Sequence, residues 1–308
     1  VAIGHDALRQ NEGNNNIAIG FQAFTANTSA SNYTAIGHAA LGSNTTASYN
    51  CAFGYYALYD NQSGTSNNAF GYAALENNTA SANCAFGSYT LQANTTGGNN
   101  TAVGHRALDG AVTMSNNTAI GAQCMTGSVT GGQNTAVGTE SLEANTGGDD
   151  NVAVGYRALE ANTTGARNVA VGRVALGSQA TESNCTAGGY YALGDNSTGS
   201  ENSAFGSNCM DALTTGNYND AFGRDALGTG TGFSECCAFG NSALKLNTGD
   251  HNCAFGFSAL VANTSGARNT AFGHRALESN TTAVNNTAVG DYALSDCTTG
   301  VDNTAVGR

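Results

Sequence analysis

A tetrapeptide of the form x-Ala-φ-Gly, in which φ is usually Val, Ile or Phe, recurs along the whole of this 308-residue chain. Its 19 copies start at positions 1, 17, 34, 51, 68, 84, 101, 118, 135, 152, 169, 186, 203, 220, 237, 253, 270, 287 and 304. They enclose 18 repeats, of which 15 are 17 residues long and three are 16. A fixed period is typical of repeat architectures. No linker interrupts it, so the sequence predicts one array over residues 1–308 rather than the two domains that this length would suggest.

We number each repeat from the residue before Ala, and its last residue is position 17 in the shorter repeats as well. The pattern is then Thr-Ala-φ-Gly-x-x-Ala-Leu-x-x-Asn-Thr-Thr-Gly-x-x-Asn. Ala at position 2 and Gly at position 4 occur in all 19 copies. Asn occupies position 11 in 12 of the 18 repeats and position 17 in 15 of the 18.

This period predicts an all-β fold, a narrow parallel β-solenoid of 18 coils. Helical repeats are longer and show apolar spacings of three and four residues, which are missing here. Short β pieces alternate instead with Asn, Thr and Gly, which tolerate the backbone of sharp turns. Stacked coils would lie about 4.8 Å apart, giving a rod on the order of 85 Å long. The chain has 42 Gly and no Pro, and proline would remove a donor from each ladder it entered.

Two assignments of the coil interior are open. The Ala at position 2 and the Gly at position 4 share one strand face, and position 3 lies on the other face. The Ala at position 7 and the Leu at position 8 should likewise lie on opposite faces. If the small residues fill a narrow interior, the large residues at positions 3 and 8 face outward. A long apolar row is rare on a soluble monomer, so we expect burial against other copies, most simply in a trimer. The opposite assignment gives a self-sufficient monomer. The predicted core or interface columns include Ile3, Ile36, Phe53, Phe70, Phe86 and Val103 at position 3, and Leu41, Leu58 and Leu75 at position 8.

The x-Ala-φ-Gly-x-x-Ala-φ pattern resembles the head repeats of trimeric autotransporter adhesins and related repeats of phage and algal-virus fibres. The likeness covers the whole chain, although 17 residues is longer than the usual adhesin head repeat. We expect no heptad stalk, neck or membrane anchor within residues 1–308, and we expect these residues to be a segment of a longer fibre. The resemblance implies left-handed β-rolls of three chains that project from a surface and bind host material.

Nine cysteines interrupt the pattern. Cys237 and Cys253 occupy position 1 of consecutive coils, about 4.8 Å apart, and are a candidate disulfide. Cys51 and Cys84 share that column but lie two coils apart. Cys124 replaces the position-7 Ala, as Cys209 does, and both are interpreted as buried core thiols.

Two further columns carry candidate chemistry. His5, His38, His105 and His274 share position 5, where three copies could bind an anion or metal only if the column faced a trimer axis; a polar or aromatic surface column is the alternative. No Cys-x-x-Cys metal spacing occurs, and we predict no metal. Asn-x-Ser/Thr sequons at the position-11 corner are candidates for N-glycosylation in a secretory setting, or simply a by-product of the repeat. These sequons are Asn27, Asn44, Asn61, Asn94, Asn162, Asn196, Asn263 and Asn280.

Charge and motifs narrow the function. A net charge of -12 without basic clusters argues against nucleic-acid binding, and no apolar run is long enough to span a membrane. No catalytic constellation or cofactor site stands out from the repeat. We therefore expect a non-enzymatic fibre module outside a cell, on a cell surface or on a virion, acting as an adhesin that meets a host surface protein or glycan. A filament subunit that stacks end to end is the alternative, and an ice-binding solenoid is a more remote one.

Overall fold

The computed structural model describes residues 1–127 and 130–308 and is all-β, with 19 short strands and no helix in the described part. The chain forms two compact units, residues 1–151 and 152–308, which are built from the same coil. The first unit contains β1 (Ala2–Ile3), β2 (Ile17–Ile19), β3 (Thr34–Ile36), β4 (Cys51–Phe53), β5 (Asn68–Phe70), β6 (Cys84–Phe86), β7 (Thr101–Val103), β8 (Thr118–Ile120) and β9 (Thr135–Val137). The second contains β10 (Val152–Val154), β11 (Val169–Val171), β12 (Thr186–Gly188), β13 (Ser203–Phe205), β14 (Asp220–Phe222), β15 (Cys237–Phe239), β16 (Cys253–Phe255), β17 (Thr270–Phe272), β18 (Thr287–Val289) and β19 (Thr304–Val306).

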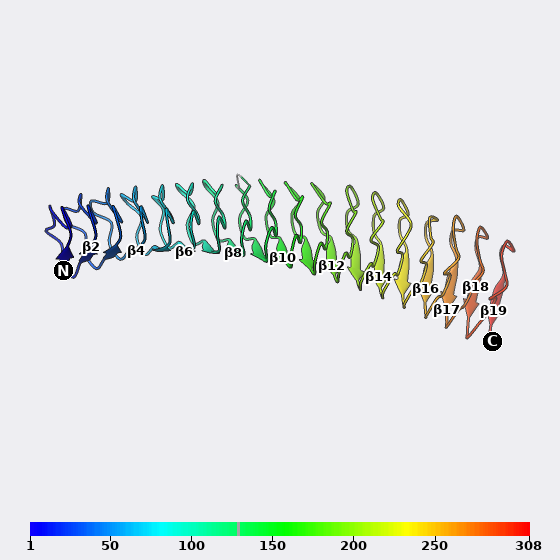
Figure 1. The fold of residues 1–308 in the computed structure, drawn as a ribbon. Coiled ribbons are helices and arrows are strands. Elements are labelled where there is room, and N and C mark those ends of the chain that lie inside the picture. The colour runs from blue at the N-terminus through cyan, green and yellow to red at the C-terminus, as the bar shows by residue number, and fades with distance from the viewer. Residues whose placement is uncertain (128–129) are drawn as a thin grey trace. The chain divides into compact units, whose positions relative to one another are not determined.

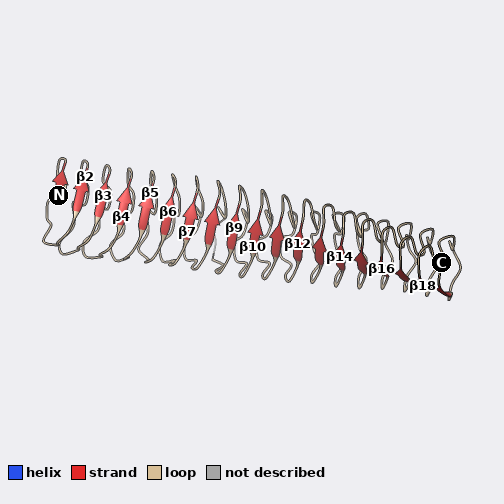
Figure 2. Ribbon diagram, turned by 90° about the horizontal axis from the view of Figure 1, so that it is seen from below, coloured by secondary structure: helices blue, strands red, loops and turns tan. Residues whose placement is uncertain are grey.

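Within each unit, every strand pairs in parallel with the strand of the next coil. The register joins equivalent repeat positions, as in Ala52 with Ala69 and Phe53 with Phe70. Successive coils therefore lie side by side within a unit (Figure 1), and their strands line one face (Figure 2). The predicted fold class is confirmed: the chain is a parallel β-solenoid of about 18 turns with a 17-residue period. Its handedness and its trimeric state stay predictions.

The strand alternates as the sequence predicted. The central Ala is buried in every strand except β1 and β19, for example Ala52, Ala69 and Ala238. The following position-3 residue lies outward and is half-buried or exposed, as are Phe70 and Phe86. The first of the two assignments is thus correct for the strand, because small side chains fill the space behind it.

The prediction that the Leu column faces outward is wrong. Leu41, Leu58 and Leu75 are fully buried, although the position-7 Ala next to each of them is buried too. Position 8 has a left-handed backbone, with φ of 53° at Leu58 and 53° at Leu75. Strand alternation does not apply to such a segment, so consecutive side chains can both enter the core. The interior is therefore an Ala-lined strand packed against a column of leucines.

The invariant glycines at position 4 follow from backbone conformation rather than from volume alone. Gly71 has φ of +146°, a region that L side chains rarely adopt. A Cβ atom at Gly71 would also run into the backbone carbonyl of Gly87 in the next coil. The same close approach to the next coil occurs at position 4 in both units, for example at Gly37 and Gly223, which explains why glycine recurs there.

The position-17 asparagines form buried ladders inside both units. The Asn67 backbone N–H donates to Asn50 Oδ1 at 2.8 Å, and the Asn83 N–H donates to Asn67 Oδ1 at 2.9 Å. Asn67 Nδ2 donates to the carbonyl of Ala80 at 2.8 Å. Each amide thus satisfies backbone groups of the next coil, and buried backbone groups need such partners. None of the described residues with a positive φ is an Asn of position 11 or 17; the non-glycine left-handed positions are mainly 6, 8 and 16, and Asn occurs among them at position 16, as at Asn99.

Candidate interaction surface

The outward position-3 column forms an aromatic ladder in each unit. In the first unit Phe53, Phe70 and Phe86 stack, with ring centroids 4.8 and 4.6 Å apart. In the second unit the stacked rings are Phe205, Phe222, Phe239, Phe255 and Phe272. Ile3 and Val103 continue the first column and are 58% and 37% exposed. The predicted interface residues of position 3, Ile36 included, therefore lie together on one surface.

A second outward column runs along position 5 of the first unit. His5, Phe21, His38, Tyr55 and Tyr72 stack in consecutive coils, with centroids 4.7 to 5.4 Å apart. The histidines thus stand in a row of aromatic rings, as the surface interpretation predicted. Position 4 lies between the two columns and is always glycine. The large side chains of positions 3 and 5 are therefore separated by a residue without a side chain.

The position-5 stack is interrupted at Ser88, and a hollow opens beside it. Tyr89, from position 6, packs edge-on against Tyr72 at 5.1 Å and against His105 at 6.3 Å. A hollow of about 350 Å³ is lined by Tyr89, Gln92, His105 and Arg106.

A smaller hollow of about 210 Å³ adjoins the first through Arg106, which lines both. Its other lining residues are Asp109, Gln123 and Thr126. The Arg106 Nε atom lies 2.7 Å from Asp109 Oδ2. Neither hollow was predicted from the sequence, although the change to Ser88 after five successive aromatic residues at position 5 was a readable signal.

Cys237 and Cys253 are neighbours in register on the outward side of β15 and β16. Both are free thiols in the structure and are partly buried. Burial, together with the neighbouring Cys253, raises the pKa of Cys237 to about 11. The thiol is therefore mostly protonated at neutral pH, which slows its oxidation because the thiolate is the reactive form. The predicted disulfide stays a prediction.

The cysteines at position 7 are core residues, as predicted. Cys124 and Cys209 are fully buried. Cys124 Sγ donates to the carbonyl of Ala136 at 3.4 Å, and Cys209 Sγ donates to that of Ala221 at 3.3 Å. Burial raises the pKa of Cys124 to about 11 and that of Cys209 to about 12. Neither thiol is suited to chemistry at neutral pH.

The sequon asparagines at position 11 are buried rather than exposed at a corner. Asn61 Nδ2 donates to the carbonyl of Gly64 at 2.8 Å, and the Gly64 N–H donates to Asn61 Oδ1 at 3.0 Å. Such an amide, closed on its own turn and covered by the coil, leaves no room for a glycan in the folded chain. The same burial, with no exposed side-chain area, applies to all eight candidates: Asn27, Asn44, Asn61, Asn94, Asn162, Asn196, Asn263 and Asn280.

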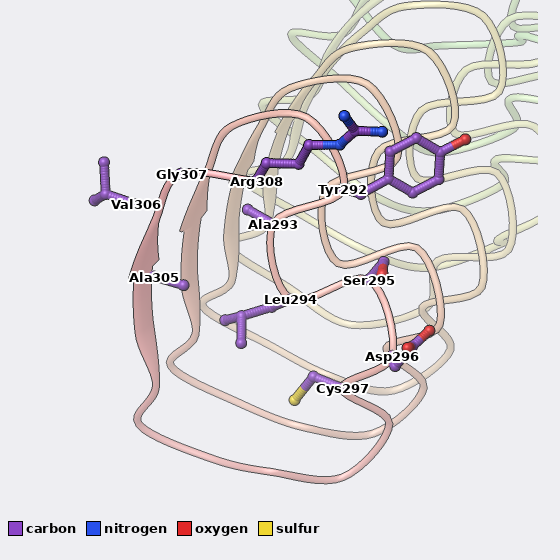
Figure 3. A pocket seen from close by; sticks show the side chains of 10 residues that line it. All are labelled: Tyr292, Ala293, Leu294, Ser295, Asp296, Cys297, Ala305, Val306, Gly307 and Arg308. Atoms are coloured by element: carbon purple, nitrogen blue, oxygen red, sulfur yellow. The ribbon is translucent and has the colours of Figure 1, made fainter.

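Figure 3 shows the interior of the last coil of the second unit end-on. Leu294 and Ala305 point into a cavity of about 330 Å³, whereas Val306 points away from it. Of the cavity lining, Ala293, Leu294 and Ala305 belong to the inward columns at positions 7, 8 and 2. The lining brings together no group of catalytic residues.

No family model matches the chain, and no curated protein matches it either. Among the described residues, no helix is long and apolar enough to cross a membrane. The resemblance to adhesin head repeats therefore stays a prediction.

Proposed function

We propose that this chain is a non-enzymatic module of a fibre, displayed outside a cell, on a cell surface or on a virion, in which further copies cover the position-3 column. The outward phenylalanine ladder carries the proposal. It places aromatic side chains on the surface in consecutive coils of both units, with Phe86 41% and Phe272 55% exposed. Stacking within one chain covers only the ring faces that point along the column, so the outer edges stay in contact with water.

The size of the surface supports self-association. With coils about 4.8 Å apart, the nine strands of the first unit give an outward column about 40 Å long and, at a width of about 10 Å, roughly 400 Å² of surface. The area of one such column is similar to that of the largest apolar patches on ordinary monomers. Two columns, one from each unit, approach the 800 Å² or so per partner that stable complexes bury. A threefold arrangement lets every copy cover the same column of its neighbours.

Hydrogen bonds of the threonine column at position 12 favour this proposal over an ice-binding function. The hydroxyl of Thr79 donates to the carbonyl of Thr95 at 2.7 Å, and that of Thr95 to the carbonyl of Val112 at 2.9 Å. Thr264 makes the same bond to Thr281. These hydroxyl protons are therefore used within the coil stack and are not available to order water.

The test is the oligomeric state of the purified chain. Analytical ultracentrifugation at micromolar concentration should give three times the chain mass. Replacing Phe53, Phe70 and Phe86 together by Glu should shift the protein to monomer and leave its far-ultraviolet circular dichroism spectrum unchanged, because these side chains lie outside the coil.

A matched triple variant controls for added charge. Tyr49→Glu, Ser66→Glu and Asn99→Glu change exposed residues at position 16, a column in which Glu201 and Glu235 occur naturally. This variant should stay oligomeric. A wild-type monomer, or equal dissociation of both triple variants, would overturn the proposal, and a dimer would overturn the threefold arrangement alone.

A further inference from the structure

The two adjoining hollows of the first unit combine an aromatic wall with several fixed polar groups. The backbone at position 6 is left-handed, with φ of 59° at Tyr89 and 58° at Arg106, and side chains from positions 6 and 9 of the same coil line one hollow. The pairing of Arg106 with Asp109 joins the two positions directly. Positions 6 and 9 of three consecutive coils therefore line a short polar trough beside the rings of Tyr89 and His105.

The polar groups of the trough are held in place by their own hydrogen bonds. Gln92 Nε2 donates to Glu76 Oε2 at 2.7 Å, which orients the Gln92 amide. Arg106 Nε donates to Asp109 Oδ2 at 2.7 Å, so its guanidinium is oriented as well. Groups that are already oriented lose less entropy when a ligand binds.

The electrostatic balance of the trough argues against an anionic ligand. Its one guanidinium is paired with Asp109, and Glu76 lies against Gln92. The whole chain carries a formal charge of -12. An anion would therefore meet a site without excess positive charge on a protein of the same sign. A neutral ligand with several hydroxyl groups meets no such penalty.

We propose that this trough binds a neutral saccharide unit, with the apolar face of the sugar against Tyr89 and its hydroxyl groups bonded to Gln92, Arg106 and Asp109. Amide, guanidinium and carboxylate groups each present two donors or acceptors side by side, which suits a pair of neighbouring hydroxyls. The larger hollow alone lies within the range of about 300–1,000 Å³ that is usual for small-molecule sites. The inference rests on the proposed display function, since it names the class of ligand that the displayed surface binds.

Saturation-transfer NMR on the whole chain tests the inference. The probes are the methyl glycosides of glucose, galactose, mannose and N-acetylglucosamine at millimolar concentration, with inorganic phosphate as the charged comparison. At least one glycoside should receive saturation through its ring C–H protons. Its affinity should fall at least tenfold in Tyr89→Ala and in Gln92→Leu.

Tyr49→Ala is the control, because Tyr49 is 64% exposed and lies outside the trough. It should bind as the wild type does, and thermal melting should show that all variants fold. The inference is overturned if none of the glycosides binds, if phosphate binds more tightly than all of them, or if Tyr89→Ala and Gln92→Leu bind normally. Ultracentrifugation of the same samples separates this failure from that of the proposed function: an oligomer that binds no glycoside refutes only the saccharide site.

Discussion

The apolar columns at positions 3 and 8 look alike in the sequence and behave oppositely in the structure. Phe70 and Leu75 belong to the same coil, five residues apart. Phe70 lies outward between two other rings, whereas Leu75 has no exposed area. One column completes the interior of the coil, and the other remains available for contacts with further copies.

The difference between the two columns comes from the backbone. Position 3 ends a short strand, in which side chains alternate between inside and outside. Position 8 lies in a segment whose φ angles at positions 6 and 8 are positive, for example 52° at Ala73 and 53° at Leu75. Left-handed conformation is unfavourable for residues other than Gly, so burial of the leucine must compensate for its cost in every coil.

A buried charge gives the largest expected effect and tests this contrast directly. Leu75→Asp places a carboxylate in the closed interior and should prevent the surrounding coils from folding, because an unpaired buried charge is strongly destabilising. Phe70→Asp should retain the circular dichroism spectrum and a cooperative melt, since its carboxylate reaches water. Equal loss of structure in both variants would show that position 3 also belongs to the core.

The asparagine ladder offers a matched pair of adjacent residues. Asn67 is buried and bonded to two neighbouring coils, whereas Asn68 is exposed in β5. Asn67→Ala leaves the buried Asn83 N–H without its partner, whereas the Ala80 carbonyl keeps the bond that it accepts from Asn78 Nδ2 at 2.8 Å. The expected cost is about 1–3 kcal/mol of unfolding free energy, the usual value for one buried group left unpaired.

Asn68→Ala should cost less than about 0.5 kcal/mol, as exposed substitutions usually do. Urea melts of the two variants, followed by circular dichroism, measure the difference. Similar midpoints would mean that the ladder adds no net stability.

The buried thiols give the smallest effect, which appears only at alkaline pH. Burial raises the pKa of Cys209 from 9.0 to about 12 in the folded chain. Below pH 9 the Cys209 thiol is protonated in both the folded and the unfolded chain, and its contribution to the free energy of unfolding is fully present. Between pH 9 and about 12 only the unfolded chain ionises, so stability falls as pH rises.

Cys209→Ala restores the usual position-7 residue and removes this ionisation. Between pH 7 and pH 10 the unfolding free energy of the wild type should fall by about 1.4 kcal/mol more than that of the variant. Denaturant melts in the presence of a reducing agent measure this difference. Parallel losses in the two proteins would show that Cys209 is accessible to solvent in the folded state.

Much of the architecture could be predicted because it depends on period and register. A 17-residue repeat with a strand-forming tetrapeptide and no proline leads to stacked parallel coils, and identical residues then form columns. Alternation within a strand also placed Ala52 and Phe53 on opposite faces correctly, although it left open which of the two faces inward. Stacking by register likewise brought Cys237 beside Cys253.

The trough at Tyr89 and the burial of the position-11 asparagines could not be deduced in the same way. Asn61 reads as a polar corner residue in sequence, but its amide closes on Gly64 beneath the next coil. The trough depends on Tyr89 turning into the space left at Ser88, and that turn is set by contacts between three coils.

The sequence by itself determined the repeat length, the parallel stacking and the placement of positions 2 and 3 on opposite strand faces, because each follows from periodicity along the chain. Which of these two faces lies inward was decided by the tertiary structure. The tertiary structure also decided that Leu75 lies inside, that Gly71 has no alternative and that Asn67 serves the backbone of its neighbours. These outcomes depend on the path of the backbone between strands and on its distance to the next coil. Sequence spacing does not report either quantity, since both arise only when coils pack on one another.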